Sequence, residues 1–189
     1  MQLCGGELKQ TPPPEAKPGL RLISRPLANH RLWAPWRLQY LKGERSSDCI
    51  FCSKPALGDE EALIVHRGGS CYVILNAFPY TNGHVMVAPY EHVADLRGLD
   101  AGAAGELMSL TQRALAAIEA VYGAEGFNLG ANLGDIAGAG FADHFHMHVV
   151  PRWKGDTNFM PVVGDTRVMP ESLPDSWAKL REAFERAGA

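Results

Sequence analysis

Three histidines alternate along the segment DHFHMHVVPRW (residues 143–153): His144, His146 and His148. In an extended strand, side chains two positions apart project from the same face and lie about 6.6 to 6.8 Å from one another. The three imidazoles are therefore expected to form a row on one face, with the apolar residues between them on the other. A lone histidine is more often a surface or core residue than part of a site, but three in register favour chemistry.

Two kinds of chemistry fit such a row. A metal ion binds histidine nitrogen at about 2.0 to 2.1 Å, whereas the outer two imidazoles lie about 13 Å apart along the strand. One ion can therefore take no more than two neighbours, which makes a metal-dependent hydrolase the less favoured hypothesis. In the favoured one, an imidazole attacks phosphorus while its neighbours orient it and protonate the leaving oxygen. His146, in the middle of the row, is then the nucleophile.

Cys49 and Cys52 form a C-x-x-C pair, whereas Cys4 and Cys71 stand alone. The pair has the spacing of half a tetrahedral zinc site, but no second pair follows at zinc-finger distance, so further ligands must come from far along the chain. The alternative is a pair of free thiols. This usage is not that of a disulfide-stapled secreted domain, and it predicts reduced cysteines and a cytoplasmic protein.

The elements that must position these residues follow from the hydrophobic pattern. Asn82-Gly83 is a turn signal and predicts that the strands over residues 70–78 and 84–90 pair antiparallel. A helical stripe predicts one long helix over residues 100–123, closing at Gly123. The pattern favours an α+β fold, an antiparallel sheet of about five strands with the helix packed on one face. The predicted strands are residues 70–78, 84–90, 126–134 and 144–153.

Composition bounds the remaining questions. Residues 1–30 are proline-rich without a hydrophobic period and predict an extended or disordered arm, which leaves residues 31–189 as one catalytic domain. In the aromatic segment 31–41, core packing is the favoured reading and a dimer contact the alternative. A net charge of −3 gives no electrostatic footprint for duplex nucleic acid, and no apolar run is long enough to predict a membrane span.

The segment HFHMHVV resembles the signature of the histidine triad family of nucleotidyl hydrolases and transferases. The similarity runs from about Leu32 to about Leu173 and includes CIFC, ILNAFPYTNGHVMVAP, EHVADL and NLGANLGDIAGAG. The resemblance implies that His146 attacks an α-phosphate, that His148 lies near the leaving group and that His84 is the family's upstream histidine. It also implies that Asn76 contacts the ribose and that Asn132 lies on the phosphate side.

The zinc-bearing members of the family imply the missing metal ligands. His92 and His144 match their positions and complete a Cys₂His₂ set with Cys49 and Cys52. With four protein ligands and no open position, such a zinc ion is structural, not catalytic.

The loop before the triad reads Gly138-Ala139-Gly140, where many members have glutamine followed by serine or threonine. The glycines leave backbone N–H groups free to face phosphate, although a plain flexible connection is the alternative. The surrounding stretch is most similar to the bacterial diadenosine tetraphosphate phosphorylases, in which orthophosphate releases the nucleotide. Trp153 is a further candidate substrate contact, stacking on a base or walling the leaving-group side.

Other outcomes stay open on the sequence alone. Water in place of orthophosphate makes the protein a dinucleoside polyphosphate or phosphoramidate hydrolase. A zinc-stabilised nucleotide-binding module without catalysis is a third hypothesis. The resemblance also implies a homodimer formed through the long helix and a sheet edge.

Overall fold

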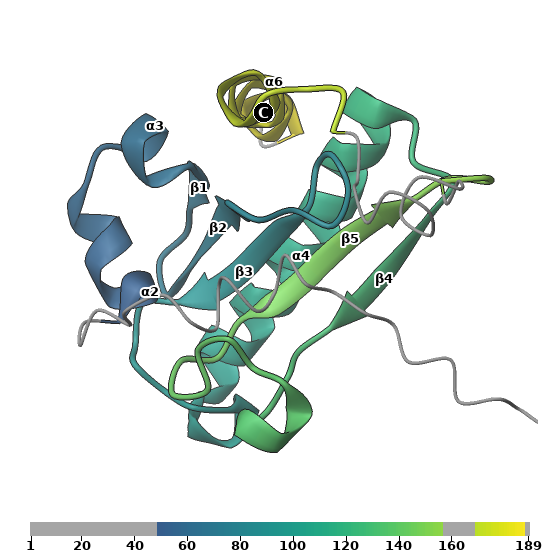
Figure 1. Cartoon of the computed structure of the whole chain (residues 1–189). Coiled ribbons are helices and arrows are strands. Elements are labelled where there is room, and N and C mark those ends of the chain that lie inside the picture. Colours follow the sequence, from purple (N-terminus) through teal and green to yellow (C-terminus); the bar gives the residue numbers. More distant parts are fainter. Residues whose placement is uncertain (1–48, 157–168, 188–189) are drawn as a thin grey trace, which may run out of the picture. The chain divides into compact units, whose positions relative to one another are not determined.

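The computed structural model describes residues 49–156 and 169–187, all within one structural unit. They contain a five-stranded antiparallel sheet in the order β1-β2-β3-β5-β4 (Figure 1). The predicted α+β fold is therefore confirmed, whereas the proline-rich arm and the aromatic segment 31–41 lie outside the described residues. The strands are β1 (Ile64–Arg67), β2 (Cys71–Leu75), β3 (Val85–Pro89), β4 (Gly126–Gly130) and β5 (Met147–Arg152).

The predicted pairing of β2 with β3 is confirmed, but the connection is longer than a two-residue hairpin. The loop is closed by hydrogen bonds from Asn76 N to His84 O (2.9 Å) and from His84 N to Thr81 O (3.2 Å). Gly83 adopts a φ of 77°, and a Cβ there would lie 2.8 Å from Cε2 of Tyr122. Glycine is needed here both for the left-handed backbone and for the close approach of the tyrosine.

The long helix α4 (Ala101–Tyr122) matches the predicted helix closely. Asp100 caps its first turn by accepting a hydrogen bond from Ala103 N at 2.7 Å. Gly123 ends it in the left-handed conformation, with a φ of 59°. Leu107, Ala114 and other residues of the helical stripe are buried against the sheet, so burial of this apolar face holds the helix in place.

The C-terminal helix α6 (Leu173–Ala187), which the sequence analysis did not predict, covers the same face of the sheet as α4. It buries Leu180, Ala183 and Phe184 in the shared core. The indole N–H of Trp177 donates to Ile64 O at 2.9 Å and ties α6 to the first strand. One face of the sheet is thus occupied by two helices, which leaves the other face for a site.

The opposite face carries a second, smaller apolar cluster, which includes Phe51, Tyr72 and Ile74. Short helical segments pack there: α2 (Ile50–Ser53), η1 (Lys54–Ala56) and α3 (Asp59–Ala62). Two further short segments, η2 (Leu96–Gly98) and η3 (Asp135–Ala137), lie in loops. No helix within the described residues has the length and apolar character needed to cross a membrane.

Candidate active site and metal centre

The predicted two-faced arrangement of the histidine segment is present, although the regular strand begins later than predicted. Phe145 and Val149 are buried in the core under α4, whereas the rings of His146 and His148 line a cavity on the opposite face. His144 and His146 precede β5, in a segment without regular secondary structure that is held by a hydrogen bond from Phe145 N to Val93 O at 2.6 Å. The three histidines also divide by environment, because His144 belongs to a cluster of sulfur and nitrogen ligands instead.

His146 is held in one tautomer. Its Nδ1 lies 2.9 Å from the carbonyl oxygen of His144, which can only accept a hydrogen bond. Nδ1 therefore carries the proton, and Nε2 retains its lone pair. The side chain is only 6% exposed, and burial lowers its pKa below 6.5, although the hydrogen bond to His144 opposes that shift. The ring is thus a neutral imidazole with a free lone pair on Nε2, the form that a nucleophile requires.

Hydrogen bonds also fix the tautomers of His84 and His148, which are linked to each other. The N–H of Tyr80 donates to Nδ1 of His84 at 3.1 Å, so Nε2 of His84 carries the proton. Nε2 of His84 lies 3.0 Å from Nδ1 of His148 and donates to it. This leaves the proton of a neutral His148 on Nε2. Burial, with smaller contributions from His148 and His146, lowers the pKa of His84 to about 3, so His84 stays neutral.

A cavity of about 310 Å³ opens beside these rings. Its polar side is formed by His146, His148, Asn76, Asn132 and Gly140, so five of the predicted site residues are brought together. The carboxamide of Asn76 is fixed because its Oδ1 accepts from Phe78 N at 2.9 Å. The rest of the lining is Ile50, Phe51, Lys54, Ala62, Leu63, Ile74, Leu75, Ala77, Phe78, Tyr80, Met86 and Phe141.

Two predicted substrate contacts lie elsewhere among the described residues. The indole of Trp153 packs against the core beneath α4, and its N–H donates to Tyr122 O at 3.1 Å. Gly138 ends η3 with a φ of 82° and donates its N–H to Asp135 O at 2.9 Å. Neither residue is part of the cavity lining, so a role in substrate binding stays a prediction for both.

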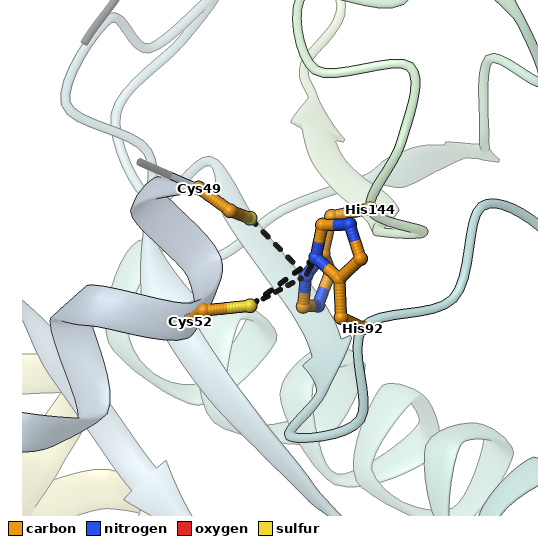
Figure 2. A group of neighbouring side chains, drawn as sticks. All are labelled: Cys49, Cys52, His92 and His144. Carbon is orange, nitrogen blue, oxygen red and sulfur yellow. Dashed lines mark hydrogen bonds between the residues drawn. The ribbon is translucent and has the colours of Figure 1, made fainter. Parts of the chain in front are cut away.

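Cys49, Cys52, His92 and His144 converge from three separate segments (Figure 2). Nδ1 of His144 lies 3.3 Å from Sγ of Cys49, 3.5 Å from Sγ of Cys52 and 3.3 Å from Nδ1 of His92. Sγ of Cys52 lies 3.2 Å from Nδ1 of His92. Around a tetrahedral zinc ion, neighbouring sulfur and nitrogen ligands are about 3.5 Å apart and two nitrogens about 3.4 Å apart. The donor types and their spacing therefore fit zinc.

The outer contacts of this cluster also suit a metal ligand. Nε2 of His144 lies 3.0 Å from the carbonyl oxygen of Pro89 and donates to it. The lone pair of Nδ1 therefore points toward the sulfurs and His92, as the second hydrogen bond of a ligating histidine ensures in metalloproteins. The carbonyl of the same residue fixes the tautomer of His146. The candidate metal centre and the candidate nucleophile thus share contacts with one residue, His144.

Sequence reasoning missed several residues of the cavity, chiefly Phe51, Lys54 and Phe141. Phe51 and Lys54 sit in and directly after CIFC, and the nearby cysteines were the only signal that this segment reaches the site. Apolar residues carry no signal of chemistry of their own, so the cavity wall could not be separated from the core. Lys54 is the one side chain with a fixed charge among the described lining residues.

The HIT domain model matches residues 58–155, more than half of the chain. The chain belongs to the HIT-domain family. It is 44% identical over 165 residues to a protein of Mycobacterium tuberculosis described as an AP-4-A phosphorylase, a match that covers 82% of this chain and 85% of the relative. It is 32% identical over 104 residues, 55% of this chain and 74% of the relative, to an adenosine 5'-monophosphoramidase of Schizosaccharomyces pombe.

Solved structures agree with the family. A zinc-bound histidine triad family protein of Mycobacterium smegmatis superimposes with a TM-score of 0.61 at 25% identity, covering 75% of this chain and 96% of that one. A protein of Sulfolobus tokodaii described as a hypothetical histidine triad nucleotide-binding protein gives a TM-score of 0.59 at 25% identity, covering 73% of this chain and 93% of that one. The resemblance drawn from HFHMHVV is confirmed. Cys49, Phe51 and Cys52 lie before the matched domain, so their place in the site comes from the fold.

Proposed function

We propose that this HIT-domain protein is a nucleotidyl transferase that cleaves dinucleoside polyphosphates through a covalent adduct on His146. Orthophosphate then releases the nucleotide as a nucleoside diphosphate. The observation that carries the proposal is the hydrogen bond from His146 Nδ1 to the His144 carbonyl. It leaves Nε2 as a buried, unprotonated nucleophile beside a cavity that suits a nucleotide.

The reaction has two displacements. Nε2 of His146 attacks the α-phosphorus, a nitrogen–phosphorus bond forms, and the bond to the bridging oxygen breaks with its electron pair on the leaving nucleotide. His148, which accepts from His84 at Nδ1, is placed to donate a hydrogen bond from Nε2–H to that oxygen and so stabilise the charge that develops on it. Orthophosphate then attacks the same phosphorus, and the electron pair returns to Nε2.

The two sides of the cavity match the two parts of a nucleotide. The apolar part of the lining includes Ile50, Phe51 and Ile74. Such residues suit the flat, largely apolar faces of a nucleobase, and this part is proposed to hold the base. Asn76 also lines the cavity and is proposed to contact the ribose. Asn132 and the backbone of Gly140 are proposed to contact phosphate oxygens, since such donors suit the charge of a phosphoryl group.

Orthophosphate is favoured over water as the acceptor for two reasons. The loop Gly138-Ala139-Gly140 carries no hydroxyl side chain that could fill the space of a second phosphate. The relative in Mycobacterium tuberculosis, to which the chain is 44% identical, is described as a phosphorylase. Water as acceptor, which gives a hydrolase, is the alternative that experiment separates directly.

The decisive assay incubates the full chain with diadenosine tetraphosphate, with and without orthophosphate. ADP and ATP that form only with orthophosphate support the proposal, whereas AMP and ATP identify a hydrolase. Intact-mass measurement after rapid quenching is expected to find an adduct of one AMP on the protein and none on His146→Ala. Product formation that survives in His146→Ala contradicts the covalent mechanism.

We also propose that Cys49, Cys52, His92 and His144 hold a structural zinc ion, supported by their spacing and by the zinc-bound neighbour of known structure. When bound, the ion cross-links three segments and supplies no open coordination position. Metal analysis of the purified protein is expected to give about one zinc per chain. Loss of that zinc in Cys52→Ser, but not in Cys71→Ala, assigns it to this cluster.

A homodimer is proposed as the assembled form. Strand β4 is one of the two outer strands of the sheet within the described residues, and Leu129 on it is exposed. An uncovered strand edge offers unpaired backbone groups that a second copy can satisfy. Light scattering after size exclusion tests this state.

The reduced cysteines still predict a cytoplasmic location, which fractionation of the native cell tests.

A further inference from the structure

The aromatic ring of Phe51 lies face to face with the nucleophile. Its centroid is 4.6 Å from that of His146, with an interplanar angle of 23°. Phe51 is 1% exposed, and its carbonyl accepts a hydrogen bond from the Tyr72 hydroxyl at 2.8 Å. Cys49 and Cys52 flank it on the same short segment. The ring is thus fixed both by packing and by the backbone that carries it.

The reaction creates a positive charge on the ring that Phe51 faces. The free imidazole of His146 is neutral, with its proton on Nδ1. When Nε2 bonds to phosphorus, Nδ1 keeps its proton, so the imidazole ring becomes an imidazolium that carries one positive charge. Because His146 is 6% exposed, water solvates that charge poorly, and neighbouring groups must do so.

The described residues offer few groups for this task. No carboxylate is among those that line the cavity, and the nearest fixed charge in that lining, Lys54, has the wrong sign. His148 meets the His146 ring edge-on at 4.9 Å, and its imidazole carries no negative charge. Two groups with negative character remain, the His144 carbonyl at Nδ1 and the π face of Phe51.

We propose that Phe51 is a catalytic residue whose π face stabilises the nucleotidyl-imidazolium on His146 through a cation–π contact. An aromatic face within about 6 Å of a cation attracts it, most strongly where water is excluded. The contact gains strength only as the charge develops, so it lowers the barrier to adduct formation more than it strengthens substrate binding. This inference rests on the proposed function, since the charge belongs to the covalent intermediate.

The test replaces Phe51 with phenylalanines that carry one, two and three fluorines on the ring. Fluorination withdraws charge from the π face while the ring keeps nearly the same shape. The rate constant for AMP-adduct formation, measured in a single turnover with diadenosine tetraphosphate, is expected to fall stepwise, by about tenfold for the trifluoro ring. The KM is expected to change by less than about twofold. Phe51→Leu, which keeps apolar bulk, is expected to show a similar loss.

Phe184 provides the matched control, because it is as buried as Phe51 and also stacks on an imidazole, that of His66 at 5.5 Å, but lies outside the cavity lining. Its trifluoro variant is expected to form the adduct at the wild-type rate. A rate constant that does not change across the Phe51 series overturns the inference while leaving the adduct mechanism intact. A rise in KM alone does so too, and makes Phe51 a wall of the base slot. If the unmodified protein forms no adduct, the proposed function itself fails, and this inference falls with it.

Discussion

Three hydrogen bonds decide which nitrogen of each imidazole holds its proton. Two of these hydrogen bonds come from main-chain groups: the His144 carbonyl accepts from His146, and the Tyr80 N–H donates to His84. The backbone has no alternative tautomer, so it dictates the state of each ring it contacts. As a result, a lone pair at His146 and an N–H at His148 are available at the same cavity, the proposed nucleophile beside a hydrogen-bond donor.

Adduct formation is expected to tolerate acid better than an exposed histidine would allow. Burial lowers the pKa of His146 below 6.5, so its imidazole stays unprotonated as the pH falls through 6.5. The single-turnover rate constant should therefore change little between about pH 7.5 and 6.5 and fall only below that range. A midpoint of the acid limb above 6.5 contradicts this assignment. The profile is measured in a constant-ionic-strength buffer.

Because of His84, the free energy of unfolding is expected to decrease in acid. The pKa of His84 is about 3 in the folded chain, against 6.5 ordinarily, so the unfolded chain binds more protons in between. The free energy of unfolding should then decrease as the pH falls from about 6.5 toward 3, by up to about 1.4 kcal/mol per pH unit.

Urea unfolding at several pH values tests the His84 prediction against His84→Gln, which has no titratable ring. Release of metal by acid affects both proteins alike, so the difference between their slopes isolates His84. The slope should be shallower in the variant, and equal slopes contradict the assignment.

At the scale of elements, the loop between β2 and β3 places Asn76 and His84 at one end of the sheet. Gly83 makes this possible, with a φ of 77° and Tyr122 of α4 close against it. Gly83→Ala is expected to destabilise the chain by about 2 to 3 kcal/mol, because it adds both backbone strain and a clash. The displaced His84 should also slow adduct formation.

Gly105→Ala is the matched control for Gly83→Ala. Gly105 lies inside α4 with open space at its Cβ position, so alanine there should stabilise by about 0.5 to 1 kcal/mol. Chemical denaturation measures both variants. Equal changes in the two would mean that the backbone at Gly83 is not special.

Elements with strong local signals were predictable from sequence, and those defined by their contacts were not. Helix α4 has a cap residue, an apolar stripe and a terminal glycine, and its bounds agree with prediction within one residue. Strand β1 is only four residues long, and its pairing with β2 is interrupted by an irregularity. Helix α6 is an exception, because Ser172 at its start and the amphipathic pattern that buries Leu180 and Phe184 are local signals that the sequence analysis did not use.

The site shows the same division at the level of single residues. His146, His148 and Asn76 carry functional groups, and the family resemblance placed them at the cavity where the fold brings them together. Phe51 differs, because its role depends on a ring that lies 4.6 Å away and 95 positions later in the chain. No local pattern encodes such a contact, so only the fold can reveal it.

At the scale of the whole domain, the cysteine and histidine cluster joins the segment of α2, the loop after β3 and the chain entering β5. Two of the joined segments carry active-site groups, Phe51 beside Cys52 and the His144 carbonyl that holds His146. A bound zinc ion should therefore stabilise the fold and the active site together.

Removal of zinc is expected to lower the unfolding temperature of the wild-type protein and to slow adduct formation. A ligand present at about 100 times its dissociation constant stabilises the folded state by about 2.7 kcal/mol, which is a shift of several degrees in the unfolding temperature for a domain of this size.

The Cys52→Ser variant should unfold at the lower temperature and show no further change with a chelator, because its site is already incomplete. Cys71→Ala should respond to the chelator as the wild type does, since Cys71 is not one of the four candidate ligands and its side chain packs in the core with α4. Scanning calorimetry with and without chelator separates these cases. A chelator effect that persists in Cys52→Ser would place the stabilising metal elsewhere, and the coupling between the cluster and His146 would lose its physical basis.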